Sequence, residues 1–327
     1  MAVIAVSGAS GWLGVRICQY LRSQKHTILA LDRHGVTEGP WHKFAALDLM
    51  VQGGGDSGWK SALEEANVLI HCAGHAHRAI ETSDEIKRFY QVNRDGTQLV
   101  LEACRNAGVL RFVYLGSMAY YNWNESVSMD EDSALNPKTA YAQSKLEGET
   151  AVVESNLDWR VARLATVFGE GDRANFSKLA QSLSVGRFVL PGNGTARKSV
   201  IPVDLAAEII CDLALRDNIP FRLFNVALPE APSLDMIVKA FVRTCGFKQP
   251  IHVPVSLLNY FALIGNCVAS VHPNFSLTSS NVRKLTMSTE VNVSRLLKLF
   301  PSRSWPTFSD SLAKHCAWYK KLGLENR

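Results

Sequence analysis

The chain begins with a short apolar segment, residues 2–6, that runs into a turn with a glycine at every third position. Between a strand and a helix, the first glycine permits a tight turn and the second lets the backbone approach a ligand. The third lets the helix pack closely on the strand. The free N–H groups at the start of the helix then favour an anion. We therefore expect contacts to a phosphate-containing ligand from Gly8, Ser10, Gly11, Trp12, Leu13 and Gly14.

Apolar runs of strand length alternate with helical patterns through the first half of the chain. Their lack of polar alternation is typical of strands covered by helices on both faces. Because crossovers between parallel strands are right-handed, the order predicts an α/β fold with a doubly wound parallel sheet of the Rossmann type. The expected strands are 2–6, 27–32, one ending at Asp48, 68–73, 111–117 and 159–167, and the expected helices are 12–23, 57–66, 83–106 and 138–155.

The alternation loosens after residue 168, where short apolar segments are separated by glycine- and proline-containing turns. We expect helices near 174–185, 204–216, 234–245 and 307–322. The pattern predicts a dinucleotide-binding Rossmann domain at 1–167 and a smaller C-terminal α/β substrate lobe at 168–327, interleaved with the first.

Composition narrows the possible partners. The chain has 327 residues, of which 47% are hydrophobic and 20% charged, as in a protein with a large buried core. Its formal net charge of +5 includes no basic run typical of nucleic-acid binding, so no nucleic-acid partner is expected. The seven cysteines are odd in number and lack a CxxC pair, which favours free thiols in a reducing compartment. The start of the chain lacks the basic segment of a signal peptide, so a cytoplasmic location is expected.

One stretch, residues 253–271, carries no charge. It contains Pro254, Asn259, Gly265 and Asn266, which interrupt its apolar character. We expect a soluble amphipathic helix followed by a loop, and no membrane span.

The second predicted strand ends in Asp32, 18 residues after Gly14. A carboxylate there can accept hydrogen bonds from both adenosine ribose hydroxyls and repel a 2′-phosphate, which favours NAD. The neighbouring Arg33 could instead meet a 2′-phosphate, so NADP remains an alternative.

Tyr141 and Lys145 lie four residues apart in a predicted helix and therefore on one face. An ammonium group beside a tyrosine lowers the pKa of the phenol by favouring the phenolate, and lysine can also hold the nicotinamide ribose. Ser117 ends a predicted strand, at the edge of the sheet where the nicotinamide ring is expected. We expect Ser117, Tyr141 and Lys145 to be the catalytic residues.

Taken together, these motifs resemble the extended short-chain dehydrogenase/reductases, specifically the NAD-dependent epimerase/dehydratase family and its UDP-sugar 4-epimerases and 4-keto-sugar reductases. The resemblance covers nearly the whole chain and implies that Ser117 binds the reacting oxygen, Tyr141 transfers its proton and Lys145 orients cofactor and base. By the same resemblance, Asp48 and Leu49 lie near the adenine, Ala73 and Gly74 lie along the cofactor, and Asn93 braces the backbone of the site. The family's usual homodimer is implied as well.

Of three nearby histidines, His71 lies within the fourth predicted strand, and His75 and His77 follow it. No carboxylate or cysteine in the sequence completes a metal site with them convincingly. We expect packing and cofactor-loop roles and no metal.

The second half resembles the family's substrate lobe. Arg197 begins a segment similar to one that binds a nucleotide-sugar diphosphate, which a guanidinium can engage through two oxygens. Arg283 is a candidate second clamp. Asn175, Phe176 and Val189 are further candidate substrate contacts.

Where sugar dehydratases of this family carry an Asp-Glu pair after the active-site Ser or Thr, this chain has Met118 and Ala119. Dehydration is therefore not expected. The leading hypothesis is an NAD-dependent epimerase of a UDP-hexose or UDP-N-acetylhexosamine that acts through a 4-keto intermediate. The alternatives are a one-way NAD(P)H-dependent 4-keto reductase of a UDP-6-deoxy-hexosamine, a dehydrogenase of a hydrophobic alcohol, and a non-catalytic NAD(P)-sensing module.

Overall fold

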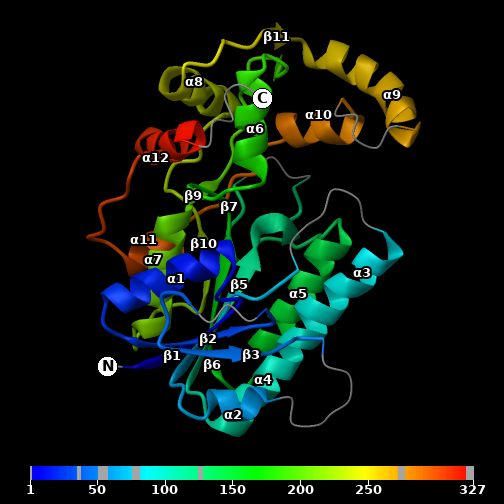
Figure 1. The fold of residues 1–327 in the computed structure, drawn as a ribbon. Coiled ribbons are helices and arrows are strands. Elements are labelled where there is room, and N and C mark those ends of the chain that lie inside the picture. Colours follow the sequence, from blue (N-terminus) through cyan, green and yellow to red (C-terminus); the bar gives the residue numbers. More distant parts are fainter. Residues whose placement is uncertain are drawn as a thin grey trace.

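A computed structural model of the chain describes residues 2–34, 38–50, 58–75, 82–123, 128–271 and 277–321. Its centre is a parallel sheet of seven strands in the order β10-β6-β5-β4-β1-β2-β3 (Figure 1). The chain order reverses between β1 and β4, which is where a doubly wound sheet opens a crevice for a ligand. The strands are β1 (Val3–Ser7), β2 (Thr27–Asp32), β3 (Lys43–Ala46), β4 (Val68–His71), β5 (Arg111–Ser117), β6 (Asp158–Leu164) and β10 (Leu223–Val226).

Helices cover both faces of this sheet, as the sequence predicted. Ile4 and Val6 of β1 pack into one core cluster with α1 (Trp12–Ser23) and α7 (Val203–Leu215). Ala5, between them, packs on the opposite face against the cluster of α2 (Trp59–Leu63), α4 (Gly96–Ala107) and α5 (Ala140–Val153). Strands β1 to β5 and helices α1, α2 and α5 form where the sequence predicted them. The third strand ends at Ala46 instead of Asp48, and the fourth ends at His71 instead of residue 73.

The prediction of one continuous α-helix over 83–106 is wrong, because the segment is interrupted by a π-helical turn. The chain forms α3 (Ser83–Tyr90), then a π-helical turn over Gln91–Asp95, and then α4. A Cβ on Gly96 would lie 2.8 Å from Cβ of Leu49, so the segment packs closely on the loop after β3. Such π-turns are frequent at functional sites, and this one carries Asn93.

The predicted strand 159–167 is in fact two strands. β6 ends at Leu164, and β7 (Thr166–Phe168) leaves the main sheet to pair with β9 (Val200–Pro202). Between them the Ala165 N–H donates to the carbonyl of Val226, at the end of β10. The chain therefore turns away from the sheet at the point where the second half begins.

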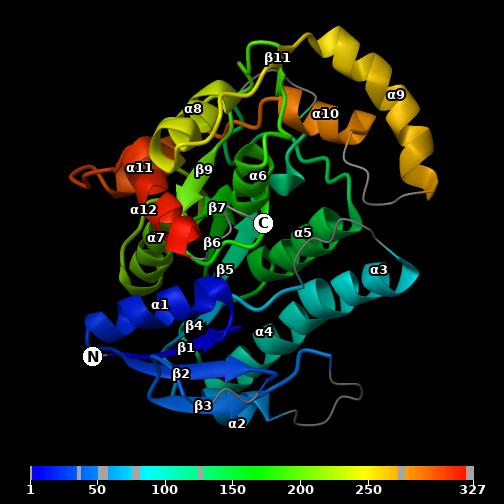
Figure 2. The ribbon, with the colours of Figure 1, turned by 45° about the horizontal axis from the view of Figure 1, so that its top comes forward.

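The second half contributes both to the main sheet, through β10 and α7, and to a group of elements beyond the carboxyl ends of the strands (Figures 1 and 2). The division at residue 167 stays a prediction. The remaining elements are η2 (Met118–Tyr120), α6 (Asn175–Ser184), β8 (Leu190–Pro191), α8 (Leu234–Cys245), β11 (His252–Val253), α9 (Val255–Val271), α10 (Ser279–Thr286), α11 (Ser294–Leu299) and α12 (Phe308–Lys321).

The uncharged stretch forms α9, which continues through Gly265 and Asn266. The prediction that this helix is amphipathic is wrong. Much of the side of α9 that faces away from the protein is apolar too, including Tyr260, Leu263 and Ile264. Among the helices that the structure describes, none has the length and apolarity needed to cross a membrane.

Candidate active site

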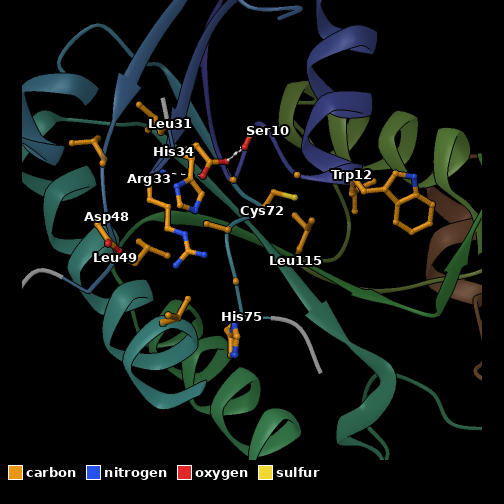
Figure 3. A pocket seen from close by; sticks show the side chains of 18 of the residues that line it. Ser10, Trp12, Leu31, Arg33, His34, Asp48, Leu49, Cys72, His75 and Leu115 are labelled. Carbon is orange, nitrogen blue, oxygen red and sulfur yellow. Dashed lines mark hydrogen bonds between the residues drawn. The ribbon is translucent and has the colours of Figure 1, made fainter. Parts of the chain in front are cut away.

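A pocket of about 510 Å³ opens at the carboxyl ends of β1, β2, β4 and β5 (Figure 3). Its size suits a cofactor, since ligand pockets commonly range from about 300 to 1,000 Å³. The predicted cofactor residues that line it are Gly8, Ser10, Gly11, Trp12, Leu13, Asp32, Arg33, Asp48, Leu49, Ala73, Gly74, Tyr141 and Lys145. His75, for which a cofactor-loop role was expected, lines it too. Lining residues that sequence reasoning missed include Leu31, His34, Leu47, Cys72, Arg88, Val92, Leu115 and Leu164.

The glycine turn forms a closely packed cradle. Gly8 has φ of +68°, and a Cβ there would lie 2.7 Å from the Ala73 backbone. A Cβ on Gly14 would lie 2.1 Å from the carbonyl oxygen of Gly8, so only glycine lets α1 approach β1 this closely. The turn therefore meets the steric demands of a diphosphate-binding loop, which is the fit that a dinucleotide requires.

Asp32 is oriented by this turn. Its Oδ2 accepts hydrogen bonds from the Ser10 N–H at 3.1 Å and from the Ser10 hydroxyl at 2.6 Å (Figure 3), while Oδ1 accepts from the Arg33 N–H at 2.8 Å. The carboxylate is therefore held at the end of β2 beside the phosphate-type turn. This is the position that the ribose-binding role requires.

The indole of Trp12 points away from the other labelled side chains of the pocket (Figure 3). Its Nε1 donates to the carbonyl of Glu170 at 2.7 Å. Trp12 therefore lines the pocket at the glycine turn and also ties that turn to the chain that enters the second half.

Tyr141 and Lys145 lie on the face of α5 that borders the pocket. The Thr139 hydroxyl caps this helix by accepting from the Ala142 N–H at 3.1 Å, which fixes where the helix begins. Ser117, at the end of β5, is hydrogen-bonded to the Tyr141 side chain. Burial raises the pKa of Tyr141, and the Ser117 hydrogen bond opposes that rise. The three predicted catalytic residues are thus brought together.

Lys145 is buried beneath this site. Its Nζ lies 4.1 Å from the centroid of the Tyr114 ring, and burial lowers the pKa of the ammonium to about 8. The negative charge of Glu149 opposes that shift. A lysine with a pKa of about 8 still carries a positive charge at neutral pH.

Asn93 connects the cofactor loop to the catalytic helix. Its Oδ1 accepts from the His75 N–H at 2.8 Å, and its Nδ2 donates to the His75 carbonyl at 3.2 Å and to the Ser144 hydroxyl at 3.1 Å. These hydrogen bonds hold the backbone at His75 against helix α5, as the role predicted for Asn93 requires.

Behind the catalytic helix lies a buried ion pair that sequence reasoning missed. Arg163 of β6 donates from Nε and Nη2 to Glu149 Oε1 of α5, at 3.0 and 2.7 Å, and from Nη1 to the Tyr121 hydroxyl at 3.0 Å. The spacing of Tyr141, Lys145 and Glu149 by four residues each could have placed Glu149 on the same helix face. Its arginine partner is distant in sequence and carried no such signal.

The histidines have packing and hydrogen-bonding roles. His71 is buried between the hydroxyls of Ser7 and Thr97, and burial lowers the pKa of its imidazole to about 3. His75 Nε2 lies 2.6 Å from Glu85 Oε2. His77 lies outside the described residues. Within the part of the chain that the structure describes, no three His, Cys, Asp or Glu side chains group as metal ligands do.

The five candidate substrate residues of the second half do not line the pocket. Asn175 is exposed at the start of α6. The Phe176 ring is buried and stacks on the Phe168 ring with 4.6 Å between centroids, and its N–H donates to Asp172 Oδ2 at 3.0 Å. Val189 packs beside Leu258 of α9 and Val282 of α10.

Arg197 is half-exposed, and its Nε lies 3.2 Å from Glu290 Oε2. Arg283 is exposed on α10. The two segments are in contact, because Lys198 Nζ donates to the carbonyls of Lys284, at 2.8 Å, and Met287. The structure thus places both arginines on adjoining segments.

A parallel sheet with a glycine cradle at its switch point, and a Ser, Tyr and Lys set beside it, defines a dinucleotide-dependent enzyme of the extended short-chain dehydrogenase/reductase class. The chain belongs to the NAD dependent epimerase/dehydratase family, which matches residues 4–227. The predicted cofactor, NAD, is therefore confirmed.

Relatives of known name agree with this class. An N-acetyl-alpha-D-glucosaminyl-diphospho-ditrans,octacis-undecaprenol 4-epimerase of Escherichia coli O157:H7 is 23% identical, over 90% of this chain and 88% of its own. A decarboxylating sterol-4-alpha-carboxylate 3-dehydrogenase of Mus musculus is 29% identical, over 46% of this chain and 40% of its own. The structure of a UDP-glucuronic acid 4-epimerase from Bacillus cereus, in complex with UDP-glucuronic acid and NAD, is 19% identical and superimposes with a TM-score of 0.75. It covers 98% of this chain and 99% of that chain.

Proposed function

We propose that this protein is an NAD-dependent epimerase that inverts C4 of a hexose or N-acetylhexosamine carried on UDP, through a 4-keto intermediate. The observation that carries the proposal is the Ser117, Tyr141 and Lys145 set beside the dinucleotide pocket. Bound NAD supplies reversible hydride transfer.

The chain's own residues hold and move the proton. The Tyr141 oxygen takes the proton of the sugar C4 hydroxyl as the carbonyl forms, and returns it when the alcohol is regenerated on the opposite face. The Ser117 hydroxyl hydrogen-bonds the same sugar oxygen, and the Lys145 charge favours the phenolate. Because the starting and final redox states are the same, no external reductant is consumed.

The substrate class is argued from the second half of the chain. Arg197 and Arg283 lie on adjoining segments, where two guanidinium groups suit a diphosphate. A UDP-sugar is bound by the Bacillus cereus relative, and a diphosphate-linked N-acetylglucosamine is the substrate named for the Escherichia coli relative. Both substrates join a sugar to a diphosphate. The sterol enzyme matches less than half of this chain, so it gives the hydrophobic-alcohol alternative little support.

One-way reduction of a 4-keto sugar uses the same three residues and is the second candidate. The purified protein, with its cofactor, should be offered UDP-glucose and UDP-N-acetylglucosamine, and the products separated by chromatography. Epimer formation without added NADH supports the proposal. Stoichiometric oxidation of NADH or NADPH with a 4-keto sugar, and no epimerisation, would establish the reductase instead. A parallel reaction with N-acetylglucosamine on undecaprenyl diphosphate tests whether the diphosphate carrier is a lipid, as in the substrate named for the Escherichia coli relative, in place of UDP.

The variant Tyr141→Phe removes the proton-carrying oxygen and keeps the ring. We expect kcat to fall about 10² to 10⁴ fold, because this is the range that one acid–base group contributes. NAD binding, followed by isothermal titration, should change little. Full activity of Tyr141→Phe would overturn the mechanism and favour the non-catalytic sensing alternative. The homodimer implied by the family, and the cytoplasmic location, stay proposals; sedimentation of the purified protein tests the first.

A further inference from the structure

Helix α9 presents an unusual surface. Of the fourteen large hydrophobic side chains that are exposed among the described residues, seven lie between Ile251 and Val268. Tyr260 and Leu263 are each 63% exposed and Ile264 is 53% exposed. Exposed apolar patches of this kind mark sites of interaction with a partner or a membrane.

The opposite side of α9 is held by the protein. Leu258 and Ala262 are buried, and they form a small apolar cluster with Val282 of α10. The helix lies at the outer margin of the molecule in both ribbon views, with α10 between it and the sheet (Figures 1 and 2). One stripe therefore anchors α9, and the exposed apolar side faces outward along the helix.

The charge around α9 indicates what would cover it. Residues 236–289 contain five Lys or Arg residues and no Asp or Glu. The rest of the chain has equal numbers of basic and acidic residues, so this segment accounts for the whole formal net charge of +5. All five basic side chains are exposed, but Lys239 and Arg243 lie on α8, where Lys239 pairs with Asp235 at 2.7 Å. The other three lie on segments next to α9: Lys248 just before β11, and Arg283 and Lys284 on α10, which contacts α9. An uncharged apolar helix with exposed cations on the neighbouring segments complements an anionic lipid surface.

A second copy of the chain is a poorer match. In a symmetric contact through α9, each partner would bring the same basic segment to the interface, with no acidic residue of that segment to pair with it. A helix of 17 residues extends about 26 Å, less than the thickness of a bilayer core. With one side fixed to α10, it is placed to lie in the plane of a membrane surface.

We propose that α9 docks this protein on an anionic membrane surface, with Tyr260, Leu263 and Ile264 entering the lipid and with Lys248 and Lys284, on the neighbouring segments, binding the headgroups. The proposal goes beyond the proposed function and does not depend on it. The assay below measures lipid binding only, so its failure and a failure of the epimerase proposal are distinguishable.

The test is flotation of the purified full-length protein with vesicles of phosphatidylcholine alone or with a third of phosphatidylglycerol. We expect the parent protein to float with the anionic vesicles and less with the neutral ones. Tyr260→Ser, Leu263→Ser and Ile264→Ser combined should lower the partition coefficient at least about tenfold, since three buried apolar side chains exceed the ~1.4 kcal/mol that a tenfold change represents. The matched control combines Leu110→Ser, Val153→Ser and Leu297→Ser, which are exposed on other elements, and should bind as the parent does.

The basic residues have their own variant. Lys248→Gln with Lys284→Gln should weaken binding to anionic vesicles about fivefold or more, because each contributes about 1 kcal/mol near such a surface. Binding to neutral vesicles should stay the same. The control, Lys25→Gln with Lys60→Gln, removes the same charge from the first half of the chain.

A second measurement covers the case in which the triple variant fails to fold. Cys267 is the exposed cysteine of the seven and lies on α9, so a fluorophore attached to it reports directly on the helix. Its emission should shift to the blue on addition of anionic vesicles and be quenched by a nitroxide lipid. Three outcomes would overturn the proposal: no flotation of the parent, no response at Cys267, or an α9 variant that binds vesicles normally. Conversion of an oligomer to a monomer by the triple variant, without lipid binding by the parent, would assign the surface to a second copy.

Discussion

Lys145 lines the cofactor pocket, and burying its charged ammonium lowers the stability of the folded protein. In the folded protein the pKa of its ammonium is lowered to about 8 from 10.5, so the folded state holds this proton less tightly than the unfolded chain does. Below pH 8 both states carry the charge and the folded state bears the full cost. Between pH 8 and 10.5 the unfolded chain binds more protons, so this group makes the folded protein more stable as the pH rises.

Replacing Lys145 with Met should therefore stabilise the cofactor-free protein at pH 7, by about 1 to 3 kcal/mol, with the difference shrinking towards pH 10. The same variant should lose activity, because the charge beside Tyr141 is gone. Urea unfolding of both proteins at pH 7 and 9.5 measures the difference. A variant that is less stable than the parent at pH 7 contradicts the assigned burial cost.

Individual site residues were predictable where a strand end or a helical spacing fixed their place. Asp32 and Ser117 end strands, and Tyr141 and Lys145 share a helix face, so sequence position alone implied their meeting at one edge of the sheet. The burial of Phe176 was not predictable, because the rings that cover it, including Phe241 and Phe308, come from distant helices. Hydrophobic periodicity shows that a side chain faces inward but not what it meets.

For the secondary-structure elements, it was easier to predict whether a segment is a helix or a strand than whether it continues without a break. The segment 83–106 has a helical pattern throughout, and nothing in its composition marks the extra residue of a π-turn, which follows from close packing of Gly96 on Leu49. Residues 159–167 form one apolar run, yet the chain bends at Ala165 because its N–H pairs with β10. Tertiary contacts decided both cases, through packing in the first and a hydrogen bond in the second.

The buried pair of Arg163 and Glu149 joins two of these elements, β6 and α5. Both side chains are almost fully buried, and Glu149 Oε1 accepts two of the hydrogen bonds that the guanidinium donates. Arg163→Met leaves the carboxylate buried without its cation, and removing one partner of such a pair costs about 3 to 5 kcal/mol.

We expect denaturant unfolding of Arg163→Met to show a loss in that range, and the double variant with Glu149→Gln to recover part of it, since the remaining buried group is then neutral. Arg222→Met is the control. Its guanidinium is half-exposed and lies 4.0 Å from Asp158, so its loss should cost less than about 1 kcal/mol. Equal losses in the single and double variants would show that lost packing, not the unpaired charge, dominates.

At the scale of the whole molecule, the sheet is completed by chain that lies far from its other strands in sequence. β10 is only four residues long and pairs with β6, and α7 covers the sheet face next to α1. A strand this short, after a long excursion, has no periodic signal that would place it at the edge of the first sheet. This is why the sequence predicted an interleaved second lobe but not which elements interleave.

The interleaving predicts that residues 1–167 do not fold as an independent unit. The fragment lacks α7, most of whose residues are buried, and so exposes the apolar surface of α1, β4, β5 and β6 that α7 covers. It also leaves the buried Arg160 without the carbonyls of Leu213 and Arg216, to which its guanidinium donates at 3.2 and 3.0 Å.

We therefore expect fragment 1–167 to unfold without a cooperative transition in urea and to bind NAD far more weakly than the full chain. Fragment 168–327, co-expressed with it, should restore both properties, because it returns β10 and α7 to the sheet. Circular dichroism and NAD titration of the fragment, the co-expressed pair and the full chain provide the comparison. Cooperative unfolding and normal NAD affinity of 1–167 alone would show that the first domain is autonomous, and that β10 and α7 only extend a sheet that is already stable.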